Sequence, residues 1–119
     1  MAQAQAQYLS LVKPSNATID AVNRMRDAND QSVSRWRTIC RRAAADDHTL
    51  ARKMAAGHWP ASARRQVDAF VDALAEERTT WSLCATASSA DDVNAAFNDY
   101  HSASGKAEAV RIALGLPGA

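Results

Sequence analysis

Apolar residues recur at three- and four-residue steps along most of the chain, which is the spacing of one face of an α-helix. The pattern predicts four helices, over about residues 4–28, 31–56, 60–88 and 89–114. The apolar positions of the first two helices are Tyr8, Leu11, Val12, Ile19, Val22, Met25, Val33, Trp36, Cys40, Ala43, Leu50 and Met54. Those of the last two are Val67, Phe70, Val71, Leu74, Trp81, Cys84, Val93, Phe97, Tyr100, Ala103, Ala107, Val110 and Leu114. Because short connections make neighbouring helices antiparallel, we predict an all-α, up-and-down four-helix bundle.

Proline and glycine interrupt this pattern. Pro14 lies inside the first predicted helix, where it removes a backbone hydrogen bond and predicts a kink or a restart. The stretch Gly57-His58-Trp59-Pro60 separates the second helix from the third. Gly57 is expected to end the second helix in the left-handed conformation that glycine adopts without strain, and Pro60 suits the first turn of the third.

Two polar interruptions stand out on the apolar faces. Asp47 falls on that of the second helix, and Glu76-Glu77-Arg78 interrupts that of the third. Either solvent reaches the bundle at this point, or the Asp47 carboxyl has a hydrogen-bonding or charged partner there. In one antiparallel register of these two helices the interruptions coincide, with Asp47 opposite Glu77 and Arg78 beside them.

The same register places Cys40 opposite Cys84 and matches apolar positions with apolar positions, which favours a disulfide between the second and third helices. It centres the hairpin on Ser62, so it requires a wide connection or a tilted pair of helices. The alternative is two buried thiols in a reducing compartment. A redox or metal role lacks support, because the cysteines do not have CxxC spacing.

Composition restricts the class of protein. At 119 residues the chain should form one domain, which we predict over residues 8–119 after a flexible start at 1–7. The formal net charge of +1 argues against a dedicated nucleic-acid-binding protein. No apolar run approaches the length of a membrane span. The first residues have neither the basic nor the apolar region of a signal peptide, and their Ala-Gln alternation resembles the frayed start of a mature chain. The sequence leaves open whether a targeting segment preceded them.

Histidines and aromatic residues are the candidate ligand-binding groups. His48, His58 and His101 form no pair at helical i, i+4 spacing and no zinc motif, so we predict no metal site. Haem iron accepts His, Tyr or Met ligands, and a composite site for a small ligand would draw on His58, Trp59, Tyr100 and His101. The alternative is that His48 and His101 face solvent while His58 lies in a turn. No resident cofactor is predicted.

No catalytic motif is complete. GxSxG does not occur, and SxxK occurs once, as Ser10-Leu11-Val12-Lys13, without the SDN and KTG motifs that accompany it in serine enzymes of that type. Asp46-Asp47 and Glu76-Glu77 resemble paired carboxylates, but helix surfaces produce such pairs routinely, and Arg78 provides an ordinary partner. We therefore predict that the protein is not an enzyme.

The densest basic cluster surrounds Trp36 and consists of Arg35, Arg37, Arg41 and Arg42. An aromatic residue among arginines can mark a nucleic-acid contact. Trp36 belongs to the apolar face, however, so the arginines are more simply the solvated flank of a helix. They are the candidate basic contact surface of the chain.

Three short motifs suggest a family. The segment 8–17 resembles a YLxLVxPxNA opening, 59–61 a WPA motif followed by a Val-Asp pair at 67–68, and 110–117 a terminal VRxxLGLP. Their order and spacing resemble those of small extracytoplasmic helical-bundle proteins of actinobacteria, many of them lipoproteins of unknown function. The resemblance implies export, a helical bundle and a lipid anchor on a segment outside this chain. It implies no activity.

These observations favour a monomeric, extracytoplasmic binding or interaction module at the cell envelope, with a protein or a small molecule as its partner. One alternative is a carrier that holds haem or a lipid in a cleft between helices. Another is a cytoplasmic regulatory or nucleic-acid-contacting protein that uses the cluster between Arg35 and Arg42.

Overall fold

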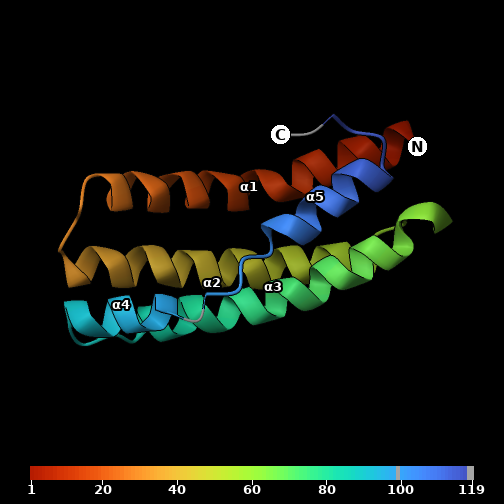
Figure 1. Ribbon diagram of the computed structural model, residues 1–119. Coiled ribbons are helices and arrows are strands. Elements are labelled where there is room, and N and C mark those ends of the chain that lie inside the picture. Colours follow the sequence, from red (N-terminus) through yellow and green to blue (C-terminus); the bar gives the residue numbers. More distant parts are fainter. Residues whose placement is uncertain (99, 118–119) are drawn as a thin grey trace.

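The protein is built from helices in the part of the chain that its computed structural model describes, residues 1–98 and 100–117. Five α-helices and one short 3₁₀-helix follow one another (Figure 1): α1 (Ala2–Asp27), α2 (Val33–Ala56), η1 (Ala61–Ala63), α3 (Arg64–Ala85), α4 (Ala90–Asn98) and α5 (Ser104–Ala113). No strand occurs among these residues. The predicted all-α class is therefore confirmed.

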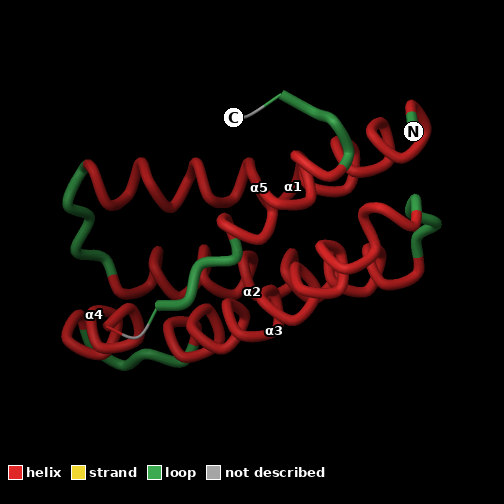
Figure 2. Tube along the Cα trace, turned by 45° about the vertical axis from the view of Figure 1, so that its right-hand side comes forward, coloured by secondary structure: helices red, strands yellow, loops and turns green. Residues whose placement is uncertain are grey.

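The hairpin of α2 and α3 is the centre of the molecule. The other helices pack against it, with α1 along α2, α5 against α3 and η1, and α4 against α3 and α2 (Figure 2). The molecule is elongated, with extents of 45 × 23 × 19 Å. Its long axis follows the hairpin, so residues far apart along α2 or α3 belong to different parts of the interior.

The fourth predicted helix is instead two short helices, α4 and α5. In the segment between them, the backbone N–H of Ala103 donates to Glu77 Oε2 of α3 at 2.6 Å. The Tyr100 ring packs edge-on against Trp81, with 5.5 Å between ring centroids. A continuous helix would use the Ala103 N–H within its own ladder, so the bond to Glu77 competes with helix formation. The serines and the glycine that follow Tyr100 are weak helix formers, which lowers the cost of the break.

α1 runs as one helix through Pro14, so of the predicted kink or restart the restart does not occur, and the kink stays a prediction. The hydroxyl of Thr18, one turn later, lies 3.3 Å from the Pro14 carbonyl and also bonds to Asp46 of α2. Thr18 is buried between the two helices. This contact joins α1 to α2 one turn after Pro14.

The first seven residues, predicted to be a flexible start, belong to α1 from Ala2 onward. Ala4 is buried, and Gln5 Nε2 donates to the carbonyl oxygen of Leu114 at 2.6 Å. Farther along α1, the Tyr8 hydroxyl donates to the Ala107 carbonyl at 3.2 Å. The start of the chain therefore packs against α5 and the residues that follow it.

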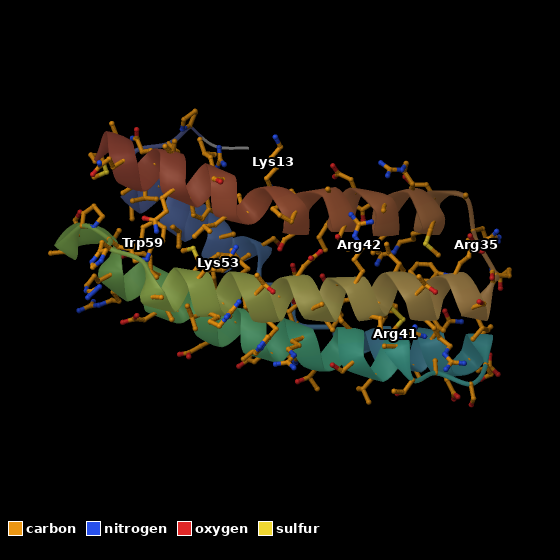
Figure 3. All side chains as sticks on the ribbon, turned by 180° about the vertical axis from the view of Figure 1, so that it is seen from behind. Lys13, Arg35, Arg41, Arg42, Lys53 and Trp59 are labelled. Carbon is orange, nitrogen blue, oxygen red and sulfur yellow. A yellow bond between two sulfur atoms is a disulfide. The ribbon has the colours of Figure 1, made fainter. Side chains whose placement is uncertain are left out.

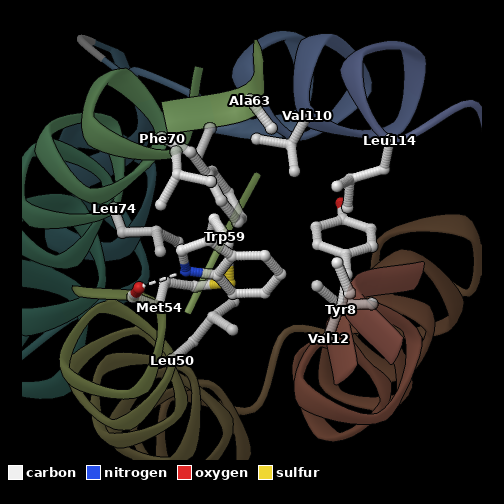
Figure 4. Packing of buried hydrophobic residues seen from close by; sticks show 13 residues of the cluster. Tyr8, Val12, Leu50, Met54, Trp59, Ala63, Phe70, Leu74, Val110 and Leu114 are labelled. Carbon is white, nitrogen blue, oxygen red and sulfur yellow. Dashed lines mark hydrogen bonds between the residues drawn. The ribbon is translucent and has the colours of Figure 1, made fainter. Parts of the chain in front are cut away.

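Two hydrophobic clusters divide the interior. The first contains Ala4, Tyr8, Val12, Leu50, Met54, Trp59, Ala63, Val67, Phe70, Leu74, Ala103, Val110 and Leu114. Figure 4 shows Trp59 near the middle of this cluster, between Met54 and Tyr8. The second contains Val22, Cys40, Ala43, Trp81, Cys84, Ala87, Val93 and Ala96.

The disulfide between Cys40 and Cys84 lies in the second cluster. The two sulfur atoms are 2.01 Å apart and the Cα atoms 5.8 Å apart. The predicted pairing is confirmed, and the alternative of two free thiols is wrong. The connection from 57 to 63 is wide and includes η1, as the predicted register requires.

Gly57 ends α2, but not in the predicted left-handed conformation. Its φ of −72° and ψ of 161° are ordinary extended values that any residue adopts. A Cβ atom at this position would lie 2.8 Å from Trp59 Nε1 and 2.9 Å from Gln7 Nε2. The close approach of the Trp59 indole, rather than the backbone conformation, is what requires glycine here.

Replacing Gly57 by alanine should therefore lower the free energy of unfolding by about 1–3 kcal/mol, the usual cost of overpacking a well-packed site. Urea denaturation measures the change. Gly105→Ala is a matched control, because a Cβ atom on Gly105 of α5 meets nothing within 4 Å. That variant should gain up to about 1 kcal/mol from the higher helix propensity of alanine. Equal effects of the two substitutions would contradict the proposed role of Trp59.

Candidate functional site

A cavity of about 300 Å³ lies where the two hydrophobic clusters meet. Its walls come from α1, α2, α3 and the segment from Tyr100 to Ala107. The apolar and aromatic wall consists of Tyr8, Val12, Ile19, Ala43, Leu50, Phe70, Leu74, Trp81, Tyr100, Ala103 and Ala107. The polar wall consists of Ser15, Asn16, Thr18, Asn23, Asp46, Asp47, Glu77, Ser102 and Ser104. A mostly apolar cavity with a few polar groups is typical of a small-molecule site.

Two carboxyl groups, Asp47 of α2 and Glu77 of α3, are buried beside this cavity. Their exposed fractions are 4% and 6%. Glu77 Oε1 accepts a hydrogen bond from Trp81 Nε1 at 3.3 Å. Glu77 Oε2 accepts from the Ala103 N–H at 2.6 Å and from the Tyr100 hydroxyl at 3.4 Å. Asp47 Oδ2, by contrast, has no hydrogen-bond partner among the described residues.

The protonation of Asp47 follows from this environment. Burial raises the pKa of Asp47 to about 9, and the negative charge of the neighbouring Glu77 acts in the same direction. The charge of Asp46 adds a smaller effect. Two adjacent buried carboxyl groups cannot both ionise readily. At neutral pH, Asp47 therefore holds a proton.

The negative charge of Asp47 and Glu77 is not neutralised by basic side chains in the cavity wall. Arg78, expected to be the partner of Glu77, instead places Nη1 3.0 Å from Nδ1 of His48, and both of these side chains are exposed. No lysine, arginine or histidine is among the residues that line the cavity. Burial also raises the pKa of Tyr100 to about 12, assisted by the negative charge of Glu77. The cavity is thus acidic as well as largely apolar.

The raised pKa of Asp47 makes stability depend on pH. Because the pKa is 3.8 for an ordinary aspartate and about 9 in the folded protein, the folded state holds an extra proton between these values. Stability should therefore be lost as the pH rises through this window, by at most about 1.4 kcal/mol per pH unit. Asp47→Asn removes this titration, so its stability relative to the wild type should increase as the pH rises. Urea denaturation from about pH 5.5 to about pH 8 tests the expectation.

Asp72→Asn is the matched control for this measurement, since Asp72 is exposed on the same hairpin and lines no part of the cavity. It should follow the wild type at every pH. A constant difference between Asp47→Asn and the wild type across the pH range would contradict the proton assigned to Asp47.

The predicted ligand set is not brought together. Trp59 is buried in the first cluster, where its Nε1 donates to the Met54 carbonyl at 2.7 Å. Tyr100 packs against the second cluster and lines the cavity. His58 and His101 are both exposed and line no part of it. Of the four candidates, only Tyr100 belongs to the site.

The candidate basic surface lies on α2. Arg35, Arg37, Arg41 and Arg42 are exposed, and Arg35 Nε lies 2.8 Å from Asp30 Oδ2. Figure 3 shows Arg41 and Arg42 on different sides of the helix, so the cluster is not a single patch. Trp36 packs against Phe97 with 5.9 Å between ring centroids, and its Nε1 donates to the Asp30 carbonyl. The half-buried indole therefore packs against the second cluster and is not grouped with the arginines.

Further features bear on the class of site. Among the described residues, no group of three or more His, Cys, Asp or Glu side chains is placed to hold a metal ion. None of the described helices is long and apolar enough to span a membrane. Comparisons with protein-family models, curated proteins and solved structures found no significant match to the chain. The function must therefore be inferred from the geometry of the cavity.

Proposed function

We propose that the protein is an extracytoplasmic binding protein that holds a small organic ligand in the cavity between its two hydrophobic clusters, without catalysing a reaction. The observation that carries this proposal is the cavity itself. It combines apolar walls with buried polar groups that can orient a ligand, as small-molecule sites do. We regard the fold as an up-and-down four-helix bundle in which α4 and α5 together replace the fourth helix.

The disulfide supports the extracytoplasmic location. Structural disulfides form and persist in oxidising compartments and are rare in the cytosol. Cys40 and Cys84 are fully buried within a hydrophobic cluster, which is typical of a structural bond rather than a redox-active one. The resemblance to exported actinobacterial proteins points the same way, and a lipid anchor on a preceding segment belongs to the same proposal.

The burial of the acid pair supports a small ligand over a protein partner. Asp47 and Glu77 lie inside the helix bundle, where another protein surface does not reach. A haem carrier is less well supported, because His58, Trp59 and His101 of the predicted ligand set do not line the cavity and only Tyr100 does. We therefore favour a compact organic molecule as the ligand.

Titration with 1-hexanol, followed by two-dimensional ¹H–¹⁵N NMR, tests the proposal. We expect saturable shifts centred on the residues around the cavity, including Val12, Leu50 and Leu74. Ala107→Leu fills part of the cavity and should weaken binding. Ala95→Leu on the exposed face of α4 is the control and should bind as the wild type does. Shifts scattered over the surface, or equal affinity in the two variants, would exclude the cavity as the binding site.

A further inference from the structure

We infer that the natural ligand is an organic cation, an ammonium group attached to a compact apolar body, and that Asp47 pairs with its charge. This inference rests on the proposed function, because it assigns a chemical class to the ligand of the same cavity. It follows from the charge of the walls, the open oxygen of Asp47 and the aromatic rings around it.

The charge of the cavity has one sign. Asp46, Asp47 and Glu77 line it, and no lysine, arginine or histidine does. Arg78, the nearest expected counter-charge along the chain, interacts with His48 at the surface. Buried carboxylates normally have a cationic partner, because removing a charge from water without one is unfavourable. None of the described residues supplies such a partner inside the cavity, whereas a cationic ligand would.

Asp47 has the free acceptor. Both oxygens of Glu77 already receive hydrogen bonds, from Trp81, Ala103 and Tyr100. Asp47 is 4% exposed and lines the cavity, and its Oδ2 has no partner among the described residues. An ammonium group donates hydrogen bonds and accepts none, so it matches this unused acceptor.

The remaining walls favour an organic cation over a metal ion. Tyr8, Phe70, Trp81 and Tyr100 contribute aromatic rings, whose faces attract cations and whose area accommodates an apolar body. A metal ion prefers several oxygen, nitrogen or sulfur ligands, and no group of three or more such side chains is suitably placed in the described chain. The cavity volume of about 300 Å³ limits the ligand to a small molecule.

Binding of an ammonium ion should displace the proton of Asp47. Before binding, the Asp47 carboxyl is protonated, because burial and Glu77 raise its pKa to about 9. A cation beside it favours the carboxylate, so the proton leaves for solvent and the ammonium keeps its own. The other titratable groups facing Asp47 are Asp46 on its own helix, Glu77 on α3, Tyr8 on α1 and Tyr100 before α5. None of these carries a positive charge, so none replaces the ligand as counter-ion.

Isothermal titration calorimetry near neutral pH with hexylammonium, 1-hexanol and hexanoate tests the inference. The three probes share an apolar chain and differ in their head groups. We expect hexylammonium to bind the wild type more tightly than the other two, because a charge-assisted hydrogen bond is stronger than a neutral one, and the preference should increase with pH because Asp47 then loses its proton more readily. Asp47→Asn should lose this preference, and Asp72→Asn should retain it. Repeating the titration in buffers of different ionisation enthalpy should show release of about one proton per hexylammonium bound by the wild type.

The outcomes separate the inference from the proposed function. Binding of 1-hexanol in the cavity without a preference for hexylammonium would overturn the cation assignment and leave the binding function intact. Binding of none of the three probes would overturn both. A preference that survives Asp47→Asn, or hexylammonium binding to the wild type without proton release, would overturn the role of Asp47. Proton release is measured on the wild type alone, so this test remains valid even if a variant folds poorly.

Discussion

Replacing Trp59 by alanine should lower the free energy of unfolding by about 3–5 kcal/mol, the largest effect we expect from a single substitution. Only 8% of the Trp59 surface is exposed, and the indole fills the first hydrophobic cluster beside the connection between α2 and α3. Truncation removes the buried ring and leaves a cavity, and it also leaves the Met54 carbonyl without the Trp59 Nε1 donor. Chemical or thermal denaturation measures the loss.

Trp59→Phe separates these two contributions. Phenylalanine retains most of the apolar packing and lacks the indole N–H, so we expect a loss of about 1 kcal/mol from the missing hydrogen bond plus a smaller packing term. A change below about 0.5 kcal/mol in Trp59→Ala would contradict the burial of this side chain, because effects of that size are usual for surface positions.

Loss of the disulfide is the second large effect. Cys40 and Cys84 are separated by 44 residues in the sequence, and the entropy of closing such a loop corresponds to about 4 kcal/mol of stability. We therefore expect the double variant Cys40→Ala, Cys84→Ala to unfold at much lower denaturant concentration than the oxidised wild type. Denaturation of the wild type with and without reductant gives an independent measure of the same quantity.

The double variant should be insensitive to reductant, which makes it the control for this experiment. Equal stability of oxidised and reduced wild type would show that the bond does not restrict the unfolded chain. Free thiols in protein isolated from its native source under non-reducing conditions would contradict the proposed oxidising compartment.

The α2–α3 hairpin was the most predictable part of the fold. A single register places Cys40 opposite Cys84 and Asp47 opposite Glu77, and the structure confirms the disulfide and brings the two carboxyl groups together. This inference succeeded because both helices are long and strongly periodic, so one pairing fixes many others. The helical class followed from the same periodicity.

Other features of the fold depend on contacts between distant parts of the chain, which the periodicity of the sequence does not reveal. The chain between α4 and α5 breaks where the Ala103 N–H bonds to Glu77, a partner 26 residues away. Gly57 is required by the nearby Trp59 indole and not by its own backbone angles. In both cases a tertiary contact decides a local feature, so the sequence pattern predicted one helix too few and the wrong reason for a glycine.

The acid pair shows the same limit in its chemistry. Asp47 and Glu77 were visible as interruptions of two apolar faces, but Arg78 suggested an ordinary surface ion pair. In the structure Arg78 turns to His48, and the two carboxyl groups lie inside the protein with no basic partner in the described part of the chain. The useful signal was that both acids occupy apolar-face positions in the same register. An arginine that follows a glutamate in the sequence need not contact it in space, since neighbouring residues of a helix point in different directions.

The most direct test of a cavity that contains a protonated Asp47 is a ¹³C NMR titration of its side-chain carboxyl, assigned by comparison with Asp47→Asn. The structure predicts a midpoint near 9 in the free protein. It also predicts that saturating hexylammonium moves the midpoint downward, because the bound cation stabilises the carboxylate. A midpoint close to the ordinary aspartate value of 3.8, unchanged by hexylammonium, would contradict both the buried acid pair and the cation site built on it.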